Sequence, residues 1–416
     1  MGEQPQAPAA FRTATDFPAS THTLVPSGAK ARVRANIAAI EMLDALREAG
    51  RPATVDEQAV LAAWSGWGAV PEVFDPRNDT FTGERQQLRD LLSVEQYRQA
   101  EASVLNAHYT DPAVVAVIWQ AMRHAGFTGG RVLEPGCGSG TFIGHAPDDA
   151  VMIGVENDAI TAAVAAHLYP SAQIRNQGFE ATRVPENSFA LTVGNVPFGR
   201  YVIADPSHNP QRFSVHNHFI CKSLALTAPG GYVAVLTSRY TLDSAKPAAR
   251  RAMAEHADFV GAIRLPSKAF ARVAGADVVT DLLILRRREP DQRAPEHTRE
   301  WVNTTSAFLD EDGEPTEVLV NSYYAAHPHH VLGTMTLGHG LNGSPTLAVD
   351  GDTGDELAEQ LSRRLTDIID LAVARGHGLS ATTESLTVVS PDTFDPGLLT
   401  AAHRALRAVG KPTAPS

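Results

Sequence analysis

Cysteine is scarce in this sequence: the 416 residues include only Cys137 and Cys221. Two cysteines exclude a disulfide framework and a cysteine-rich zinc site, and they are typical of a reducing compartment. The sequence also lacks any run of about 18 apolar residues that could span a bilayer, and its N-terminus lacks the regions of a secretory signal. We therefore expect a soluble, cytoplasmic protein with no membrane partner.

Basic residues are fewer than acidic residues. The 35 Lys+Arg against 47 Asp+Glu give a formal net charge of −12. This balance argues against a protein held on nucleic acid by bulk charge, although a local basic face stays open. The content of 43% hydrophobic and 20% charged residues is that of a globular protein. A chain of this length can bury a large core, as one domain with appendages or as two domains.

Changes in pattern divide the chain into four regions. The first is rich in Pro, Ala, Ser and Thr and is predicted to be a flexible arm, and the second is a helical extension. The third alternates short apolar strands with helices, and the fourth is an appendage of loops and amphipathic helices. Their expected bounds are 1–29, 30–103, 104–290 and 291–416.

The helical extension has clear local signals. Apolar residues recur on one face of residues 30–49, and Thr54-Val-Asp-Glu57 is a capping-box pattern that opens a second helix. Trp64, Trp67 and Phe74 follow, and either pack in the interior or face a partner. We favour packing, because aromatic residues usually belong to cores.

Seven short apolar stretches in the third region predict strands. They are residues 131–134, 152–156, 172–176, 189–195, 232–237, 260–265 and 281–286. A helix is expected before the first of these strands, because Asp111 and Pro112 are typical of an N-cap and a first-turn proline. Further helices are expected near 158–168, 215–227, 246–256, 354–374 and 397–409. Strands separated by helical crossovers predict an α/β, Rossmann-like fold with a seven-stranded, mostly parallel sheet.

The first predicted strand runs into a glycine-rich loop, EPGCGSG, residues 134–140. Glycines let a backbone turn tightly and approach a ligand, and ligands collect at the carboxyl ends of such strands. The second strand ends in Glu156, where a carboxylate can accept hydrogen bonds from ribose hydroxyls. A Rossmann dehydrogenase is the competing interpretation, but the loop is not GxGxxG, and Glu134 would repel a pyrophosphate. The loop suits a cationic, phosphate-free nucleoside such as S-adenosylmethionine (SAM).

The fourth predicted strand ends in GNVPFG, residues 194–199, at the same edge of the sheet. The Asn195 amide oxygen and the backbone carbonyl after it can accept two hydrogen bonds from an amino group. Phe198 can stack on the planar ring that carries the amine, which matches the needs of a base flipped out of a helix. Positioning provides most of such catalysis, because SAM brings its own leaving group.

In this order, NAHYT, EPGCGSG, GVEND and NVPFG resemble the motifs of gamma-ordered, amino-group SAM-dependent methyltransferases, with NVPF in place of Asn-Pro-Pro-Phe. A longer set is similar to the N-terminal methylase region of phage and plasmid methylase–helicase proteins of the defence-against-restriction type. This set is ARVRANIAAI, SGWG, LNAHYT, LEPGCG, GNVPFG, AIRLP, TDLLIL and HPHHVLGTM, within residues 30–340. Residues 270–285 also resemble a late motif of type I modification subunits.

The resemblance implies roles for the motif residues. Tyr109 and Thr110 would contact the methionine end of SAM, and Glu156 would hold its ribose. The full cofactor-binding set is Tyr109, Thr110, Glu134, Pro135, Gly136, Gly138, Gly140, Glu156, Asn157 and Phe179. The residues implied for the target amine are Asn195, Val196, Pro197 and Phe198.

Two departures from the family pattern bear on activity. Val196 replaces the usual first proline; its carbonyl remains, but its freer φ and extra N–H predict a looser loop. After the third strand, no Asp precedes Phe179, where such enzymes read the adenine amine of SAM. Gln177 or Glu180 would have to take its place.

Other polar clusters have plainer interpretations. His216 and His218 lack the second ligand segment that a metal-dependent nuclease needs. Four later histidines are expected to be surface residues, so no metal is predicted. A basic group either lines a phosphate-facing rim or forms a solvated face, and the sequence leaves both open. These sets are His327, His329, His330 and His339, and Arg239, Lys246, Arg250, Arg251, Arg286, Arg287 and Arg288.

The sequence therefore predicts a SAM-dependent DNA adenine-N6 methyltransferase of mobile-element, anti-restriction type. One alternative is a methyltransferase of RNA or of protein glutamine, which presents the same planar NH2. The other is a catalytically idle module that binds DNA and protects it. The expected partner is DNA, preferably single-stranded or distorted, where flipping costs less. The resemblance also implies a separately encoded helicase.

Overall fold

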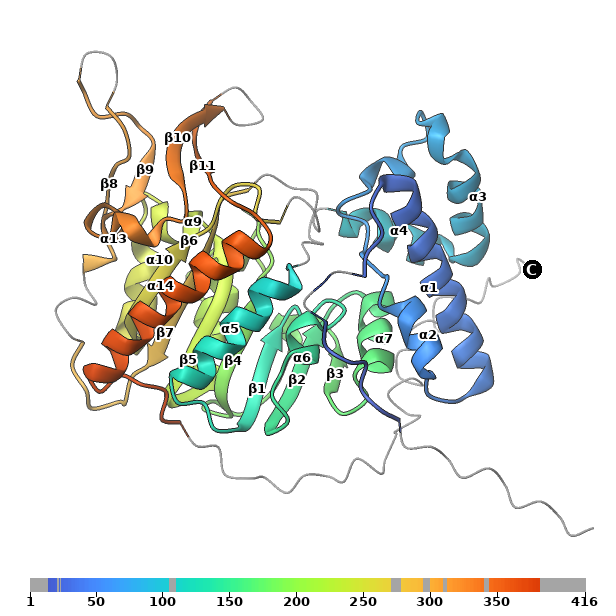
Figure 1. The fold of residues 1–416 in the computed structure, drawn as a ribbon, viewed down its shortest axis with the longest axis horizontal. Helices are drawn as coiled ribbons and strands as arrows, with labels where there is room; N and C mark the ends of the chain where they lie inside the picture. The colour runs from blue at the N-terminus through green and yellow to red at the C-terminus, as the bar shows by residue number, and fades with distance from the viewer. Residues whose placement is uncertain are drawn as a thin grey trace, which may run out of the picture.

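A seven-stranded sheet forms the centre of the molecule, in the order β3-β2-β1-β4-β5-β7-β6 (Figure 1). The computed structural model describes residues 14–20, 22, 24–104, 110–270, 278–294, 300–309, 313–339 and 344–381. The strands run parallel except β7, which is antiparallel to β5 and β6. Their bounds are β1 Gly130–Pro135, β2 Ala150–Glu156, β3 Gln173–Asn176, β4 Phe189–Asn195, β5 Thr227–Ser238, β6 Ala257–Arg264 and β7 Thr280–Arg287. The predicted α/β, Rossmann-like fold class is confirmed.

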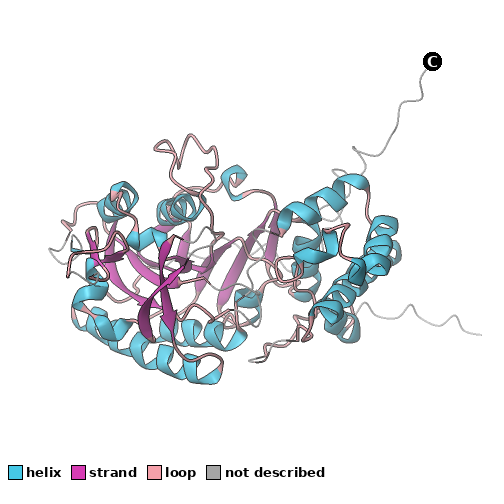
Figure 2. Ribbon diagram, turned by 90° about the horizontal axis from the view of Figure 1, so that it is seen from above, coloured by secondary structure: helices cyan, strands magenta, loops and turns pink. Residues whose placement is uncertain are grey.

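Helices cover both faces of the sheet (Figure 2). On one face α5 and α14 lie side by side, and on the other α8 packs against β5 and α10 against β6. The helices of the sheet domain are α5 Pro112–His124, α6 Thr141–Gly144, α7 Ala159–Leu168, α8 Val215–Leu226, α9 Tyr240–Asp243, α10 Ala248–His256 and α14 Asp355–Ala374, with the short η3 Phe179–Ala181. No helix within the described ranges is long and apolar enough to cross a membrane.

Alternate side chains of the central strands enter two separate hydrophobic cores. On β5, Tyr232 and Leu236 belong to the core that includes α5 and α14, whereas Val233 and Val235 belong to the core that includes α8. Successive strand side chains point to opposite faces, so a sheet covered on both faces needs apolar residues at every position. This is why stretches such as YVAVLT predict central strands correctly.

The N-terminal helices form a bundle that packs on α7. The elements are α1 Ala29–Ala49, α2 Val55–Leu61, η1 Pro71–Phe74, η2 Asp79–Phe81, α3 Thr82–Leu91 and α4 Val94–Ser103. The predicted capping box is present, since the Thr54 side chain accepts from the Glu57 N–H. Trp64 and Trp67 are each 2% exposed and meet edge to face, which confirms that they pack rather than face a partner. The Trp64 indole also donates to Thr161 Oγ1 of α7 at 3.2 Å.

Part of the predicted flexible arm is held against the sheet domain. The Phe17 N–H donates to the Leu168 carbonyl at 2.7 Å, and the Ser171 N–H donates to the Asp16 carboxylate at 2.9 Å. Residues 14–20 therefore depart from the predicted arm, because hydrogen bonds to the end of α7 fix their path. Residues 1–13 lie outside the described ranges.

The region after residue 290 contributes to the sheet domain and is not only an appendage. The predicted amphipathic helix at 354–374 is α14, and its apolar face, including Leu361 and Leu365, is buried against α5 and β6. Two small antiparallel sheets were not predicted. They are β8 Thr304–Ser306 with β9 Leu319–Asn321, and β10 Thr334–His339 with β11 Pro345–Asp350, separated by α13 Ser322–Ala326 and η4 Pro328–His330. The helix expected at 397–409 lies outside the described residues.

Candidate active site

The carboxyl ends of β1, β2 and β4 meet at one cavity of about 590 Å³. These strands are parallel neighbours, so their ends lie at the same edge of the sheet. Glu134 of β1, Glu156 at the end of β2 and Asn195 at the end of β4 all line the cavity. A volume of this size is in the usual range for a small-molecule site.

Most of the predicted site residues line this cavity, and some do not. Those that do are Thr110, Glu134, Gly136, Gly138, Glu156, Asn157, Phe179, Asn195, Val196 and Pro197. Pro135, Gly140 and Phe198 are not among the lining residues, and Tyr109 lies outside the described residues. Gly140 serves packing instead: its φ is +88°, and a Cβ there would lie 2.8 Å from the ring of Tyr169.

The glycine loop and the second strand hold the Glu156 carboxylate between them. The Gly138 N–H donates to Oε2 at 2.9 Å, and the Asp158 N–H donates to Oε1 at 2.8 Å. Gly138 can turn its N–H toward the carboxylate because its backbone has a φ of +55°. Burial raises the pKa of Glu156 to about 7, although these backbone hydrogen bonds act in the opposite direction.

Glu134 is a second carboxyl group in the cavity wall, and only 2% of it is exposed. Burial, together with the neighbouring charge of Glu156, raises its pKa well above the ordinary value. Within the described residues, its Oε2 atom is buried and has no hydrogen-bond partner. An unpaired buried acceptor is costly, so this atom favours a ligand that brings a donor or a positive charge.

The loop after β4 is held in place by hydrogen bonds on both sides of Asn195. The Asn195 amide nitrogen donates to Thr110 Oγ1 at 3.1 Å, which makes the amide oxygen the acceptor end of this side chain. The Val196 N–H donates to the Leu236 carbonyl at 3.1 Å, and Val196 is 1% exposed. The prediction that Val196 loosens this loop was therefore wrong, because the extra N–H of Val196 extends the hydrogen-bond ladder between β4 and β5.

The loop after β3 forms the opposite wall. Gln177 and Glu180 both line the cavity, but the Gln177 amide nitrogen already donates to Thr182 Oγ1 at 3.0 Å. Phe179 packs on Phe219 with ring centroids 4.8 Å apart. Of the two expected substitutes for the family's Asp, Glu180 therefore has the less committed side chain.

A buried lysine, missed in the sequence, fixes this wall. Lys222 of α8 donates to the carbonyls of Phe179 and Glu180 at 2.7 and 3.2 Å, and to the Asp205 carboxylate at 2.9 Å. His218 also bonds that carboxylate at 3.1 Å. His218 is therefore part of a buried hydrogen-bond network. The available signal was a lysine among apolar residues in the predicted helix 215–227.

The helical extension supplies another wall of the cavity. The lining residues from this region are Trp64, Gly66, Gln99, Ala102 and Ser103. Sequence reasoning treated the extension as separate from the core. Apart from SGWG in the family resemblance, no local pattern connects these residues with a loop that begins at residue 134.

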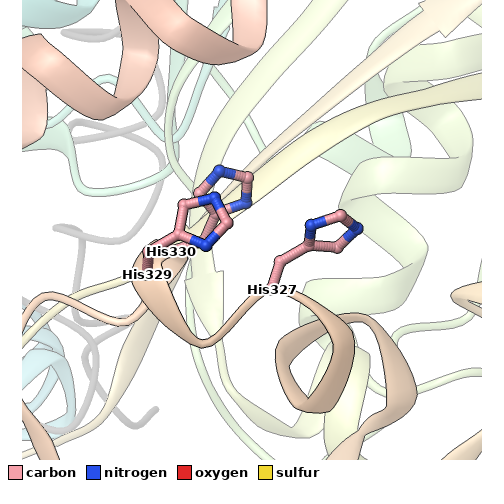
Figure 3. A group of neighbouring side chains, drawn as sticks. All are labelled: His327, His329 and His330. Atoms are coloured by element: carbon pink, nitrogen blue, oxygen red, sulfur yellow. The ribbon is translucent and has the colours of Figure 1, made fainter.

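Three of the four late histidines gather in one place (Figure 3). His327, His329 and His330 lie in and beside η4, and His330 is buried. The surface interpretation is therefore wrong for His330, which is only 7% exposed. Nothing is described of the His339 side chain.

The basic group forms neither a phosphate-facing rim nor a uniformly solvated face. Arg250, Arg286 and Arg288 are buried, and they donate to carbonyl or carboxylate oxygens of neighbouring segments. Lys246 and Arg251 are exposed. Most of these arginines therefore stabilise the packing of the chain.

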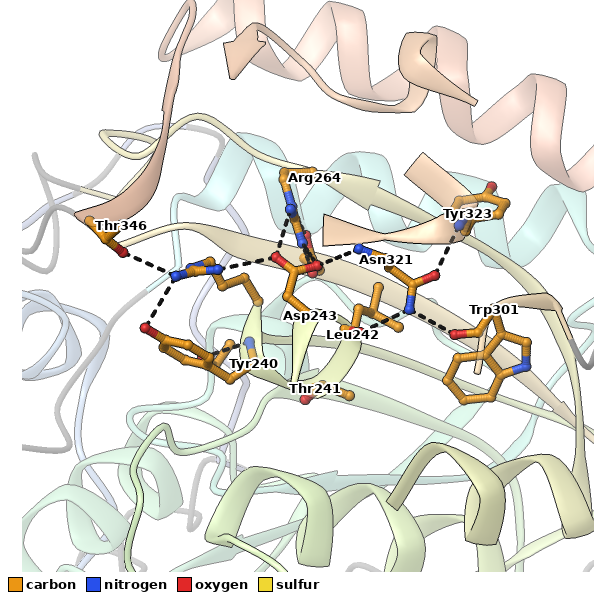
Figure 4. A network of polar contacts seen from close by, with 12 residues as sticks. Tyr240, Thr241, Leu242, Asp243, Arg264, Trp301, Asn321, Tyr323 and Thr346 are labelled. Carbon is orange, nitrogen blue, oxygen red and sulfur yellow. Dashed lines mark hydrogen bonds and ion pairs between the residues drawn. The ribbon is translucent and has the colours of Figure 1, made fainter. Parts of the chain in front are cut away.

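A buried ion network joins the sheet to the C-terminal region (Figure 4). Arg264 donates to both oxygens of Asp281, at 2.8 and 2.9 Å, and its guanidinium also pairs with Asp243 at 2.9 Å. The Asn321 N–H donates to Asp243 at 2.9 Å, and Arg239 donates to Thr346 at 3.0 Å. Arg264 and Asp281 are completely buried, so each charge depends on its partners.

Comparison with known proteins gives one curated relative. No family model matches the chain. The chain is 26% identical over 261 residues to Defense against restriction protein B of Escherichia phage P1. This match covers 62% of this chain and 10% of that protein. The chain therefore spans about a tenth of the length of this relative. The match confirms the predicted resemblance to proteins of the defence-against-restriction type.

Solved structures also align with the chain at low identity. The methyltransferase subunit of a type I restriction-modification system from Streptococcus thermophilus is 13% identical, with a TM-score of 0.41, over 79% of this chain and 68% of that one. TrmN from Thermus thermophilus is 22% identical, with a TM-score of 0.29, over 41% of this chain and 48% of that one.

Proposed function

We propose that this chain is a SAM-dependent methyltransferase that modifies the exocyclic N6 amine of adenine in DNA, in an anti-restriction role. The observation that carries the proposal is the cavity at the ends of β1, β2 and β4, which is lined by two carboxyl groups and by Asn195. The similarity to a defence-against-restriction protein supports the biological role. The fold alone does not define the chemistry, because it hosts many different reactions.

The donor groups of the cavity fit SAM. The Oε2 atom of Glu134, which has no hydrogen-bond partner among the described residues, favours a cationic ligand, and the fixed Glu156 carboxylate suits two ribose hydroxyls. Phe179 offers a ring against the adenine, and Glu180 is the better placed acceptor for its amine. Bound SAM supplies an activated methyl group on a sulfonium centre.

The residues after β4 orient the target amine. The Asn195 amide oxygen and the Val196 carbonyl accept its two hydrogens, and Thr110 fixes the rotation of the amide. This arrangement turns the amine lone pair toward the methyl group. With SAM bound, the lone pair would form the new N–C bond as the S–C bond broke, and the extra proton of the amine would pass to water. Fixing the geometry in advance removes much of the entropic barrier.

We infer a DNA substrate with little sequence preference. Specific readout needs several side chains against base edges over roughly 1,000 Å² of protein surface. In the described part of residues 300–381, the small hairpins do not resemble a compact reading domain, and a net charge of −12 gives little general attraction to DNA. The isolated chain should be slow and should prefer unpaired DNA. A separately encoded helicase, as the resemblance implies, would supply opened duplex.

Two experiments test the proposal. Calorimetry with SAM separates an enzyme from an idle DNA-binding module, since the idle module has no need of the cofactor. Labelled SAM is then offered with single-stranded DNA, duplex DNA, RNA and protein, with the slow variant Asn195→Ala as the control, and N6-methyladenine is mapped on the DNA products. SAM binding with scattered adenine methylation supports the proposal. Label in RNA or protein alone overturns the substrate, and modification confined to one short duplex motif overturns the low specificity.

A further inference from the structure

Three imidazoles converge at the turn between α13 and β10. The possible ligand nitrogens of His327, His329 and His330 all lie within 4.8 Å of one another. The ring centroids of His329 and His330 are 4.2 Å apart, and those of His327 and His330 are 5.4 Å apart. Figure 3 shows the three side chains on the same side of the turn. None of them lines the cavity described above.

These separations between nitrogens are close to those between histidine ligands of a bound transition metal. Zinc binds histidine nitrogens at about 2.0–2.1 Å in a tetrahedral arrangement, which places neighbouring nitrogens about 3.4 Å apart. The nitrogens lie within 4.8 Å of one another, and rotation of the His327 and His329 side chains, which reach solvent, can bring them closer together. Pro328 limits the backbone between the first two rings.

A tyrosine orients the buried ring. The Tyr323 hydroxyl bonds His330 Nδ1 at 2.6 Å and accepts from the Ala262 N–H of β6 at 3.4 Å. With Nδ1 engaged, Nε2 is the nitrogen of His330 that can bind a metal. A hydrogen bond to the second ring nitrogen is the usual support for a histidine ligand.

We propose that His327, His329 and His330 bind one late first-row divalent ion, with Zn²⁺ as the probe, and that water completes the coordination. Imidazole nitrogens favour such ions over Mg²⁺ or Ca²⁺. The ion would fix the turn against the sheet edge, because Val331 pairs with Arg264 of β6 and the Leu332 N–H donates to the Arg264 carbonyl at 2.9 Å. The site lies outside the cavity at the ends of β1, β2 and β4 and is independent of the proposed methyl transfer.

The test is calorimetric titration of Zn²⁺ into the metal-stripped, full chain without a polyhistidine tag. We expect one ion per chain at micromolar affinity or tighter, and no comparable binding of Mg²⁺. The double variant His327→Ala/His329→Ala should weaken binding on the order of a hundredfold, because it removes two of three ligands. Tyr323→Phe should weaken it by about tenfold, because it removes the orienting hydrogen bond. The matched control is His124→Ala, an imidazole paired with Asp370 and not part of the group of three.

The outcomes separate a built site from scattered surface histidines. Stoichiometric Zn²⁺ binding that the double variant and Tyr323→Phe weaken, and His124→Ala does not, supports the site. Absence of binding, or equal affinity in all variants, overturns it. A thermal unfolding measurement without metal shows that each variant is folded, so that a lost site is not confused with a lost fold.

Discussion

Glu156→Gln should weaken SAM binding and remove its dependence on pH between about 6 and 8. The proposed ribose contacts are charge-assisted hydrogen bonds, which contribute about 1.5–3 kcal/mol, so loss of the charge should weaken binding at least about tenfold at pH 8. Glutamine resembles the protonated acid, because only one of its side-chain atoms can still accept from Gly138 or Asp158.

The size of the pH effect follows from the pKa of about 7 that burial gives Glu156. Because this pKa is raised, the carboxyl group is protonated below it and ionised above it. The ionised fraction rises from roughly 0.09 at pH 6 to roughly 0.91 at pH 8, so wild-type affinity for SAM should rise about tenfold over this interval. The wild-type and Gln proteins should therefore differ most at pH 8 and nearly converge at pH 6.

Isothermal titration of SAM at pH 6, 7 and 8 measures both effects, with unfolding midpoints recorded for each variant. Wild-type affinity that does not change with pH would refute the assignment of an ionised Glu156 to the ribose. A pH slope that persists in Glu156→Gln would move the titration to another group, with Glu134 the nearest candidate.

Three further predictions concern catalysis and stability. Asn195→Ala should lower single-turnover methyl transfer on the order of a hundredfold and leave SAM affinity within about twofold, because the amide acts on the amine; full turnover would contradict the model. Arg264→Met should cost about 3–5 kcal/mol in urea unfolding because it removes the buried cation that Asp281 and Asp243 share. The exposed control Arg123→Met should cost less than about 1 kcal/mol, and equal losses would argue against the network. Gly140→Ala should lower the thermal midpoint more than Gly28→Ala, since both have positive φ but only Gly140 faces a ring, and equal shifts would leave backbone strain as the sole cause.

Local patterns predicted the parts of the fold whose cause is local. The strands were found because both faces of the sheet are buried, and the Thr54 box because a cap uses neighbouring residues. The site residues at the ends of β1, β2 and β4 followed from topology, since parallel strands place their carboxyl ends together.

The parts that were missed depend on contacts between distant segments. Gln99 and Ser103 line the cavity from α4, a largely polar helix in which Ala100 is the one buried residue, so its sequence gives no sign of a site. Arg264 and Asp281 are charges at the ends of apolar strands, and sequence alone does not pair them with Asp243. The error at Val196 has the same origin, because its N–H bonds a different strand.

The position of α14 has a consequence for the growing chain during synthesis. This helix covers apolar side chains of β6 and β7, including Ile263, Leu282 and Ile284. During synthesis β7 is complete at Arg287, whereas α14 is complete only 87 residues later, at Ala374. At about 5–20 residues per second, the ribosome leaves that face uncovered for roughly 4–17 s. A chain interrupted between β7 and α14 would contain every described residue of the cavity, but it would expose an apolar face of the sheet. Such a fragment should aggregate before it can bind a ligand.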